Sequence, residues 1–174
     1  MSGLQRVSVS VPLRDVDLDV GTVIPMFHEW IRRNAVEGLL IDVARYGHVH
    51  HGPGIMLVGH DGDYSVDLAG GAPALRYTLK RSDTESAQAA ISLAWKRLSG
   101  AVAEASSVGI ATVAGDVTVR VFDRLRAPNT DATAAELSAQ IEAVVADEAG
   151  LAAVRSERLS TDPREPFAVR VTGA

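Results

Sequence analysis

The histidines, the side chains best suited to bind a metal or to move a proton near neutral pH, gather mainly in one segment, Val43–Leu68. It contains four of the five histidines of the chain, namely His48, His50, His51 and His60. A turn at residues 51–54, with the sequence His-Gly-Pro-Gly, divides the segment into two strand-like arms. We therefore expect any functional site to lie on or near this hairpin.

Metal binding by this segment depends on which histidines share a face. A zinc site needs three or four ligands, each about 2 Å from the ion. His48 and His50 lie on the same face of a strand, about 6–7 Å apart along it, which suits two ligands. His51 is expected in the turn, and His60 on the opposite face. We therefore favour an exposed histidine cluster over a metal site, whose candidate ligands would be His48 and His50, and we predict no cofactor.

Strand alternation predicts which side chains of the hairpin point into the protein. With the turn centred on Gly52 and Pro53, the more apolar face is expected to point into the core: Ile41, Val43, Arg45, Val49, Met56, Val58, His60, Tyr64, Val66 and Leu68. The other face is expected to point outward: Asp42, Tyr46, His48, His50, Leu57, Asp61, Asp63 and Asp67. A shift of one residue would reverse every orientation.

Two functional hypotheses follow from these orientations. In the first, the outer face forms an interface with a second copy or a protein partner, through Tyr46, His48, Ile55 and Leu57. In the second, a pocket between the sheet and the first helix holds candidate catalytic groups, namely His28, His60, Tyr64 and Arg45. The first hypothesis predicts a dimer or larger assembly and no pocket around His60, whereas the second predicts a cavity lined by these four side chains.

Another candidate site lies where residues 122–130 leave a strand and enter the last helix. The free backbone N–H groups at a helix start attract anions. The side chains that could bind an anion there are Arg124, Arg126, Asn129 and Thr130. The interpretation that we favour is structural: an ion pair between Asp123 and Arg124, a proline turn, and a helix cap by Asn129 or Thr130.

Motifs that would name a reaction are missing. The sequence has no G-x-S-x-G elbow, no P-loop and no G-x-G-x-x-G after a strand. The stretch Asp61-Gly62-Asp63 begins like a calcium loop but lacks the later ligands. Trp30 and Trp95 fall on the apolar stripes of predicted helices, which indicates core packing. Enzymatic activity is therefore not the interpretation that we favour.

Apolar periodicity predicts the elements that must position these residues. Helices are expected at about residues 22–34, from about residue 82 to beyond residue 102, and from about residue 130 to residue 150. Strands are expected at residues 7–11, 39–49, 55–68, 75–80, 116–122 and 167–171, with a short one near 154–159. Because most strands have one apolar face, we predict a single α+β domain over residues 1–174. Its mixed or mainly antiparallel sheet should carry about three helices, packed mainly on one face.

Composition restricts the possible partners. The chain has 174 residues, of which 47% are hydrophobic and 22% charged, and this composition is typical of a globular protein. Its net charge of −5 argues against nucleic-acid binding. The chain has no cysteine, so disulfides and thiolate sites are excluded. The first residues alternate polar and apolar types, and no apolar run is long enough to cross a membrane, so we expect a cytoplasmic protein.

Several phrases carry a resemblance that spans most of the chain. They are IPxFHxWI from Ile24, LLIDVA from Leu39, HVxxGPG from His48, LxGH from Leu57 and DRLxAPNT from Asp123. In these phrases the chain resembles a family of uncharacterised bacterial proteins of about this length. The resemblance implies no activity and no catalytic residue. It implies that His28, His60, Asp123, Arg124 and Asn129 belong to recurrent phrases, whereas His50 and His51 are peculiar to this sequence.

The function that we predict from the sequence is a binding role. We expect a small cytoplasmic, non-enzymatic subunit or accessory protein that forms a homo-oligomer or binds a protein partner. The alternative is a small-molecule-binding protein or metal-dependent enzyme with a histidine-containing pocket. Neither nucleic acid nor a membrane is an expected partner.

Overall fold

A computed structural model gives the structure of residues 4–14, 18–46, 52, 54–68, 73–81 and 83–174. Three helices and eight strands follow one another in the order β1-α1-β2-β3-β4-β5-α2-β6-α3-β7-β8. The helices are α1 (Val20–Arg33), α2 (Ala87–Ser107) and α3 (Asp131–Ala149). The strands are β1 (Val7–Pro12), β2 (Leu40–Arg45), β3 (Ile55–Gly59), β4 (Gly62–Asp67), β5 (Ala74–Leu79), β6 (Asp116–Val121), β7 (Val154–Arg158) and β8 (Phe167–Gly173).

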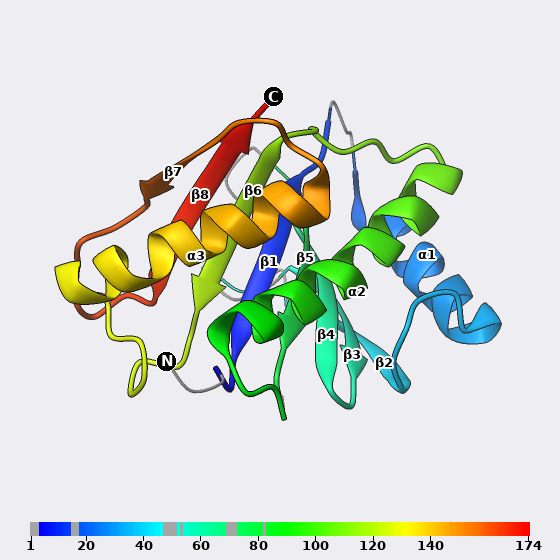
Figure 1. The fold of residues 1–174 in the computed structure, drawn as a ribbon. Coiled ribbons are helices and arrows are strands. Elements are labelled where there is room, and N and C mark those ends of the chain that lie inside the picture. Colours follow the sequence, from blue (N-terminus) through cyan, green and yellow to red (C-terminus); the bar gives the residue numbers. More distant parts are fainter. Residues whose placement is uncertain (1–3, 15–17, 47–51, 53, 69–72, 82) are drawn as a thin grey trace.

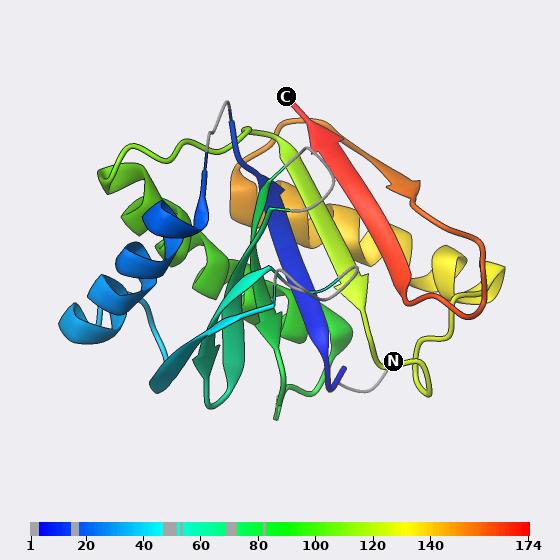
Figure 2. The same ribbon diagram turned by 180° about the vertical axis from the view of Figure 1, so that it is seen from behind.

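All eight strands form one antiparallel sheet in the order β2-β3-β4-β5-β1-β6-β8-β7. Helices α2 and α3 cross the front of the sheet in Figure 1, and α1 covers its β2 end. The reverse view shows the strands in front of α2 and α3, with α1 at the side of the sheet (Figure 2). The structure thus confirms the predicted α+β class, with helices on one face of an antiparallel sheet.

The face under the helices is apolar because the strands alternate strictly. Val7, Val9 and Val11 of β1 point toward the helices and are buried, as are Val117, Val119 and Val121 of β6. Helix α2 packs against β1 and β5 and buries Ile91, Ala94 and Leu98 there, and α1 packs against β2 and β3 and buries Phe27 and Trp30. Burial of this apolar surface is the main force that fixes the helices on the sheet.

Local signals set the helix boundaries. The carboxylate of Asp19 accepts a hydrogen bond from the Thr22 backbone N–H and caps the start of α1. Ser86 caps α2, and Thr130 caps α3. Helix α1 ends at Asn34, whose φ of 51° is left-handed, a conformation that asparagine tolerates better than most residues. Among the described residues, no helix combines the length and the apolarity needed to span a bilayer.

The prediction of one strand over residues 55–68 is wrong in one respect that changes the orientations in its first half. It is two strands, β3 and β4, which turn at His60 and Asp61 and pair with each other. Leu57 therefore lies opposite Tyr64 and on the same face, although one continuous strand would place them on opposite faces. This turn reverses the facing of β3 relative to the prediction.

The orientations predicted for this hairpin are corrected accordingly. Ile55 and Leu57, predicted at an outer contact surface, are buried in the core. Ile41 and His60, predicted to point inward, have exposed fractions of 59% for the residue and 57% for the side chain. Ile41 lies where the pairing of β2 and β3 shifts register, and His60 lies in the turn.

Two more positions of the hairpin differ from the prediction, and four others lie outside the described residues. Arg45 is exposed instead of inward, and Asp63, predicted outward, is buried. Tyr64 and Val66 do point into the core, as predicted. Val49, His48, His50 and His51 lie outside the described residues.

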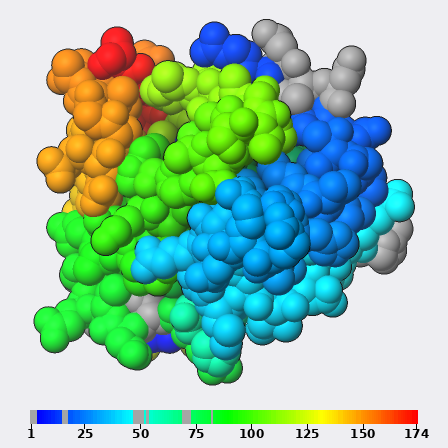
Figure 3. Space-filling model, turned by 90° about the vertical axis from the view of Figure 1, so that its right-hand side faces the viewer, coloured from blue at the N-terminus to red at the C-terminus, as the bar shows by residue number. Residues whose placement is uncertain are grey.

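The β2 end of the molecule is built by α1 and the segment after it. Figure 3 looks at this end and shows the residues of α1 packed beside those of α2. Leu39, next to β2, has an exposed fraction of 67%. The end of the sheet that carries the predicted histidine hairpin is thus partly covered by a helix, yet leaves large apolar side chains in contact with solvent.

Candidate functional site at the β3–β4 turn

A buried polar contact builds the turn between β3 and β4. Asp63 is a buried residue, and its carboxylate accepts a hydrogen bond of 3.1 Å from the Gly59 backbone N–H and lies 2.8 Å from the Lys80 Nζ atom. Lys80 Nζ also donates to the Gly59 carbonyl at 2.6 Å. These contacts fix the turn against the end of β5, so the side chains at its tip have a defined place.

Glycine is required on both sides of this turn. A Cβ atom on Gly62 would lie 2.3 Å from the Tyr77 hydroxyl oxygen, and one on Gly59 would lie 2.4 Å from the Gly62 carbonyl oxygen. Both distances are far below van der Waals contact, so larger residues would force the backbone apart. The close approach places the Tyr77 side chain directly under the turn.

A pocket of about 410 Å³ lies between this turn, the end of β5 and the middle of α2. We call it the His60 pocket. Its lining residues are His60, Asp61, Tyr77, Leu79, Arg81, Asp83, Leu93 and Arg97. Most of these side chains are polar or charged, and Leu79 and Leu93 are the two apolar ones, so the lining suits a polar ligand with a small apolar part.

Charges of both signs line the pocket. Arg97, whose side chain is 17% exposed, has its Nη1 atom 2.8 Å from Glu37 Oε1, but Nη1 makes no hydrogen bond of good geometry among the described residues. His60 Nε2 lies 3.8 Å from Asp61 Oδ1, and both side chains are more than half exposed. The pocket can therefore offer cationic and anionic groups to one ligand.

Burial raises the pKa of Tyr77, the tyrosine at the base of the pocket. Loss of solvation raises the pKa of Tyr77 from 10.0 to about 12; Arg97 works against this shift, whereas the carboxylates of Asp61 and Asp63 add to it. The hydroxyl therefore keeps its proton at neutral pH and can donate a hydrogen bond. Behind it, the Tyr64 ring lies 4.8 Å from the Tyr77 ring and the Tyr64 hydroxyl donates to the Glu37 carbonyl at 2.8 Å.

The four candidate catalytic residues of the sequence are not brought together. His28 is exposed on α1, and Arg45 is exposed at the end of β2. Tyr64 is buried and uses its hydroxyl within the core. His60 alone of the four lines the pocket as the structure describes it. A pocket does surround His60, but Tyr77, Arg81, Asp83 and Arg97 are its other polar members.

Comparison with known proteins adds no name to this site. No protein-family model matches the chain, and no curated protein matches it at a significant level. The function must therefore be argued from the geometry of the residues.

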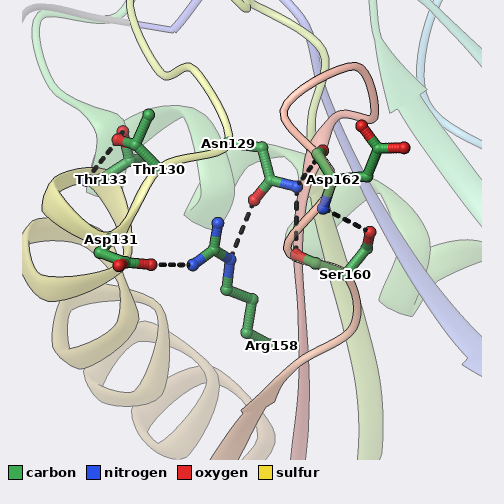
Figure 4. A network of polar contacts seen from close by, with 7 residues as sticks. All are labelled: Asn129, Thr130, Asp131, Thr133, Arg158, Ser160 and Asp162. Carbon is green, nitrogen blue, oxygen red and sulfur yellow. Dashed lines mark hydrogen bonds and ion pairs between the residues drawn. The ribbon is translucent and has the colours of Figure 1, made fainter.

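The candidate anion-binding segment is occupied by internal contacts. Asn129, buried, donates to the carbonyls of Ser160 and Asp162 at 3.1 Å and 2.9 Å, and accepts from Arg158 Nε at 3.0 Å (Figure 4). Arg158 also reaches Asp131 at 2.7 Å, and Thr130 caps α3. This network joins the start of α3 to the connection between β7 and β8.

Both arginines predicted for this segment have protein partners. Arg126 pairs with Asp123 at 2.9 Å, in place of the Asp123–Arg124 pair that the sequence predicted. Arg124 donates to the Pro163 carbonyl at 3.2 Å. The cap by Thr130 agrees with the structural interpretation. Arg158, which the sequence analysis did not single out, is the arginine that reaches Asn129.

A metal centre has no support in the part of the chain that the structure describes. No group of three or more histidine, aspartate or glutamate side chains is placed there to hold an ion. The candidate ligands His48 and His50 lie outside the described residues.

A further hollow of about 380 Å³ between α2, α3 and the end of β6 is lined mainly by apolar groups such as Leu98 and Val102. Trp95 at its wall already donates to the Glu148 carbonyl.

A pattern in the sequence could have pointed to Arg97. It stands three residues after Ala94 and one before Leu98, both on the buried stripe of α2. A charged residue at such a position is unusual, because burial of a charge is costly unless it is paired. Nothing in the sequence indicates that Tyr77 lines a pocket, because it follows the alternation of the buried apolar residues of β5.

Proposed function

We propose that the protein is a cytoplasmic small-molecule-binding protein whose ligand sits in the His60 pocket. The observation that carries the proposal is that charged side chains of both signs and a tyrosine line one cavity of about 410 Å³. Leu79 and Leu93 supply an apolar wall beside them. This combination suits a small molecule with a fixed orientation.

The charges indicate the kind of ligand. Arg81 and Arg97 suit a carboxylate, since guanidinium groups bind carboxylates through paired hydrogen bonds. Asp61 and Asp83 suit an amino group. The ligand class that satisfies both is a small zwitterion, such as a free amino acid, with its side chain toward Leu93.

Thermal unfolding tests this function, because a ligand that binds the folded state raises its Tm. Free amino acids would be compared with acetate and ethylamine, which carry only one of the two charged groups. We expect at least one amino acid to raise the Tm while acetate and ethylamine at the same concentration do not. Arg81→Gln and Asp83→Asn should each weaken that response by about tenfold.

Arg155→Gln is the matched control, since Arg155 is exposed on β7 and is not part of the pocket lining. Its response should equal that of the wild type. The proposal fails if no amino acid shifts the Tm, or if Arg81→Gln, Asp83→Asn and Arg155→Gln respond alike.

Self-association is the second candidate function, and a separate observation favours it. Leu39 and Ile41 are 67% and 59% exposed beside and within the edge strand β2, and Tyr46, predicted as a contact residue, is 38% exposed. Contact between two such surfaces would remove this apolar area from water. Light scattering should then show a dimer that Ile41→Asp converts to a monomer, and a monomeric wild type would exclude it.

A further inference from the structure

The face of the sheet that the helices leave uncovered is polar, yet its centre is buried. Ser8 and Ser10 of β1 are 1% and 5% exposed, and Ser65 of β4 is 2% exposed. The side chains of these strands alternate, so all three serines point away from the helices. This face is visible in Figure 2, on the side opposite to α2 and α3.

Register places an arginine at the centre of this face. Arg76 of β5 lies directly opposite Ser10 of β1 on one side and Ser65 of β4 on the other. Arg120 of β6 lies opposite Ser8, which precedes Ser10 by two residues on β1 and points to the same face. The central strand thus carries two serines, with one arginine beside each, on opposite sides of it.

Arg76 is largely buried, and within the described part of the chain its buried Nε atom lacks the partner that a buried polar group needs. Its side chain is 18% exposed, and its Nε atom has no hydrogen-bond partner among the described residues. The only ion pair that it makes there is with Asp67, where Nη2 and Oδ2 are 3.8 Å apart, beyond hydrogen-bond distance. A buried polar group left unpaired destabilises the folded state, because it has lost its hydration.

A second positive charge adds to this cost. Loss of solvation lowers the pKa of Arg76, the charge of Arg120 lowers it further, and Asp67 only partly opposes them. Two basic groups on the same side of the sheet do have close carboxylates: Lys80 lies 2.8 Å from Asp63, and Arg170 lies 2.5 Å from Asp116. Among the described residues, the charges that act on Arg76 are thus the positive charge of Arg120 and the negative charge of Asp67.

We propose that Arg76 and Arg120 form a binding site for a small oxyanion of the phosphate type. A phosphate oxygen can accept a hydrogen bond from the free Nε–H of Arg76, and its charge offsets the excess positive charge. The hydroxyl of Ser65, directly opposite Arg76, is a donor of the kind that completes such sites, whereas the Ser10 hydroxyl already donates to the Thr118 carbonyl at 3.5 Å. The site is distinct from the His60 pocket, since Arg76 points to the opposite face of β5 from Tyr77 and Leu79.

Phosphate itself is the probe for this site. Protein dialysed into a phosphate-free buffer would be titrated with inorganic phosphate by calorimetry, with potassium chloride and acetate at matched ionic strength as separate arms. We expect saturable binding of phosphate that chloride and acetate do not reproduce. Arg76→Met and Arg120→Gln should each raise the Kd by about tenfold or more, whereas Arg155→Gln leaves it unchanged.

Thermal stability without phosphate separates a ligand site from a structural arginine. Methionine is close in length to arginine and carries no charge, so Arg76→Met should leave the Tm of the phosphate-free protein unchanged or higher. Phosphate should raise the Tm of the wild type and not that of Arg76→Met. The proposal is overturned if phosphate does not bind, if chloride or acetate acts equally, or if neither Arg76→Met nor Arg120→Gln changes the Kd. Should Arg76→Met fail to fold, Arg120→Gln alone decides by the same criterion.

Discussion

At the scale of single residues, the sequence pointed to histidine chemistry, but the structure places the buried polar groups elsewhere. The identities of Arg76, Tyr77 and Arg97 were plain in the sequence, but their burial depends on neighbours far away along the chain. Arg76, for example, meets Ser10 across β1 and β5, and this register is set by the whole sheet. Residue types could therefore suggest a polar pocket around His60, but not which side chains complete it.

Tyr77 allows a prediction of pH dependence. Burial raises the pKa of Tyr77 from 10.0 to about 12, so the folded protein keeps this proton where the unfolded chain has lost it. The free energy of unfolding should therefore be unaffected by Tyr77 below pH 10 and fall as the pH rises toward about 12. Urea unfolding at a series of alkaline pH values would measure the fall.

Phenylalanine variants identify the source of that fall. Tyr77→Phe should reduce the slope of unfolding free energy against pH, because it removes the titrating hydroxyl. Tyr64, whose pKa burial also raises, should still contribute to the remaining slope. Tyr46→Phe removes an exposed hydroxyl and serves as the control. Equal slopes in the wild type and Tyr77→Phe would contradict the assignment.

At the scale of elements, strict alternation was predictable and a short turn was not. The valines of β1 and β6 and the apolar stripe of α2 lie in the core as their spacing predicts. The β3–β4 turn was missed because its two residues, His60 and Asp61, lie in a segment that continues to alternate on both sides. One missed turn reversed the facing of β3, which moved Ile55 and Leu57 from a predicted interface into the core.

Carboxylates protect both edges of the sheet. In β2, the Val43 backbone N–H donates to the Asp42 side chain at 2.8 Å. In β7, the Ser156 backbone N–H donates to the Glu142 carboxylate of α3 at 2.9 Å. An N–H group that already donates to a carboxylate cannot donate a hydrogen bond to a strand of another molecule. Contacts between copies through β2 would therefore use its exposed side chains more than its backbone.

The protected edge at β7 can be tested by one substitution. Glu142→Ala removes the acceptor and frees the Ser156 N–H, so we expect strand pairing between copies along β7. Light scattering at increasing protein concentration should show a higher average mass than for the wild type, together with a loss of about 1 kcal/mol in stability. Asp147→Ala removes an exposed carboxylate from the same helix and should change neither quantity. An unchanged mass for Glu142→Ala would mean that the carboxylate does not guard this edge.

At the scale of the whole molecule, β1 joins two groups of strands that follow each other along the chain. On one side lie β2 to β5, which form a meander, and on the other lie β6, β8 and β7. Because β1 pairs with both β5 and β6, neither group has a complete sheet without it. The two proposed sites share this dependence, since the His60 pocket and Arg76 are both held by β5.

A substitution in β1 should therefore destabilise both groups of strands together. Val9 is fully buried at the centre of the strand, and Val9→Ala should lower the free energy of unfolding by about 2 kcal/mol. The fluorescence of two single-tryptophan variants reports on the unfolding of the two groups of strands separately. Trp95→Phe leaves Trp30, whose ring lies 6.2 Å from that of Tyr64 in β4, and Trp30→Phe leaves Trp95, which bonds to α3.

If residues 1–174 form one cooperative unit, the two reporters should show coincident urea transitions. Val9→Ala should then shift both transitions equally. Val108→Ala, at an exposed position, should shift neither transition and controls for the loss of a side chain alone. If instead Trp30 and Trp95 reported separate transitions, the chain would contain two units that fold independently. In that case a ligand in the His60 pocket would stabilise only the unit that holds β4 and β5, whereas an oxyanion between Arg76 and Arg120 would link the two.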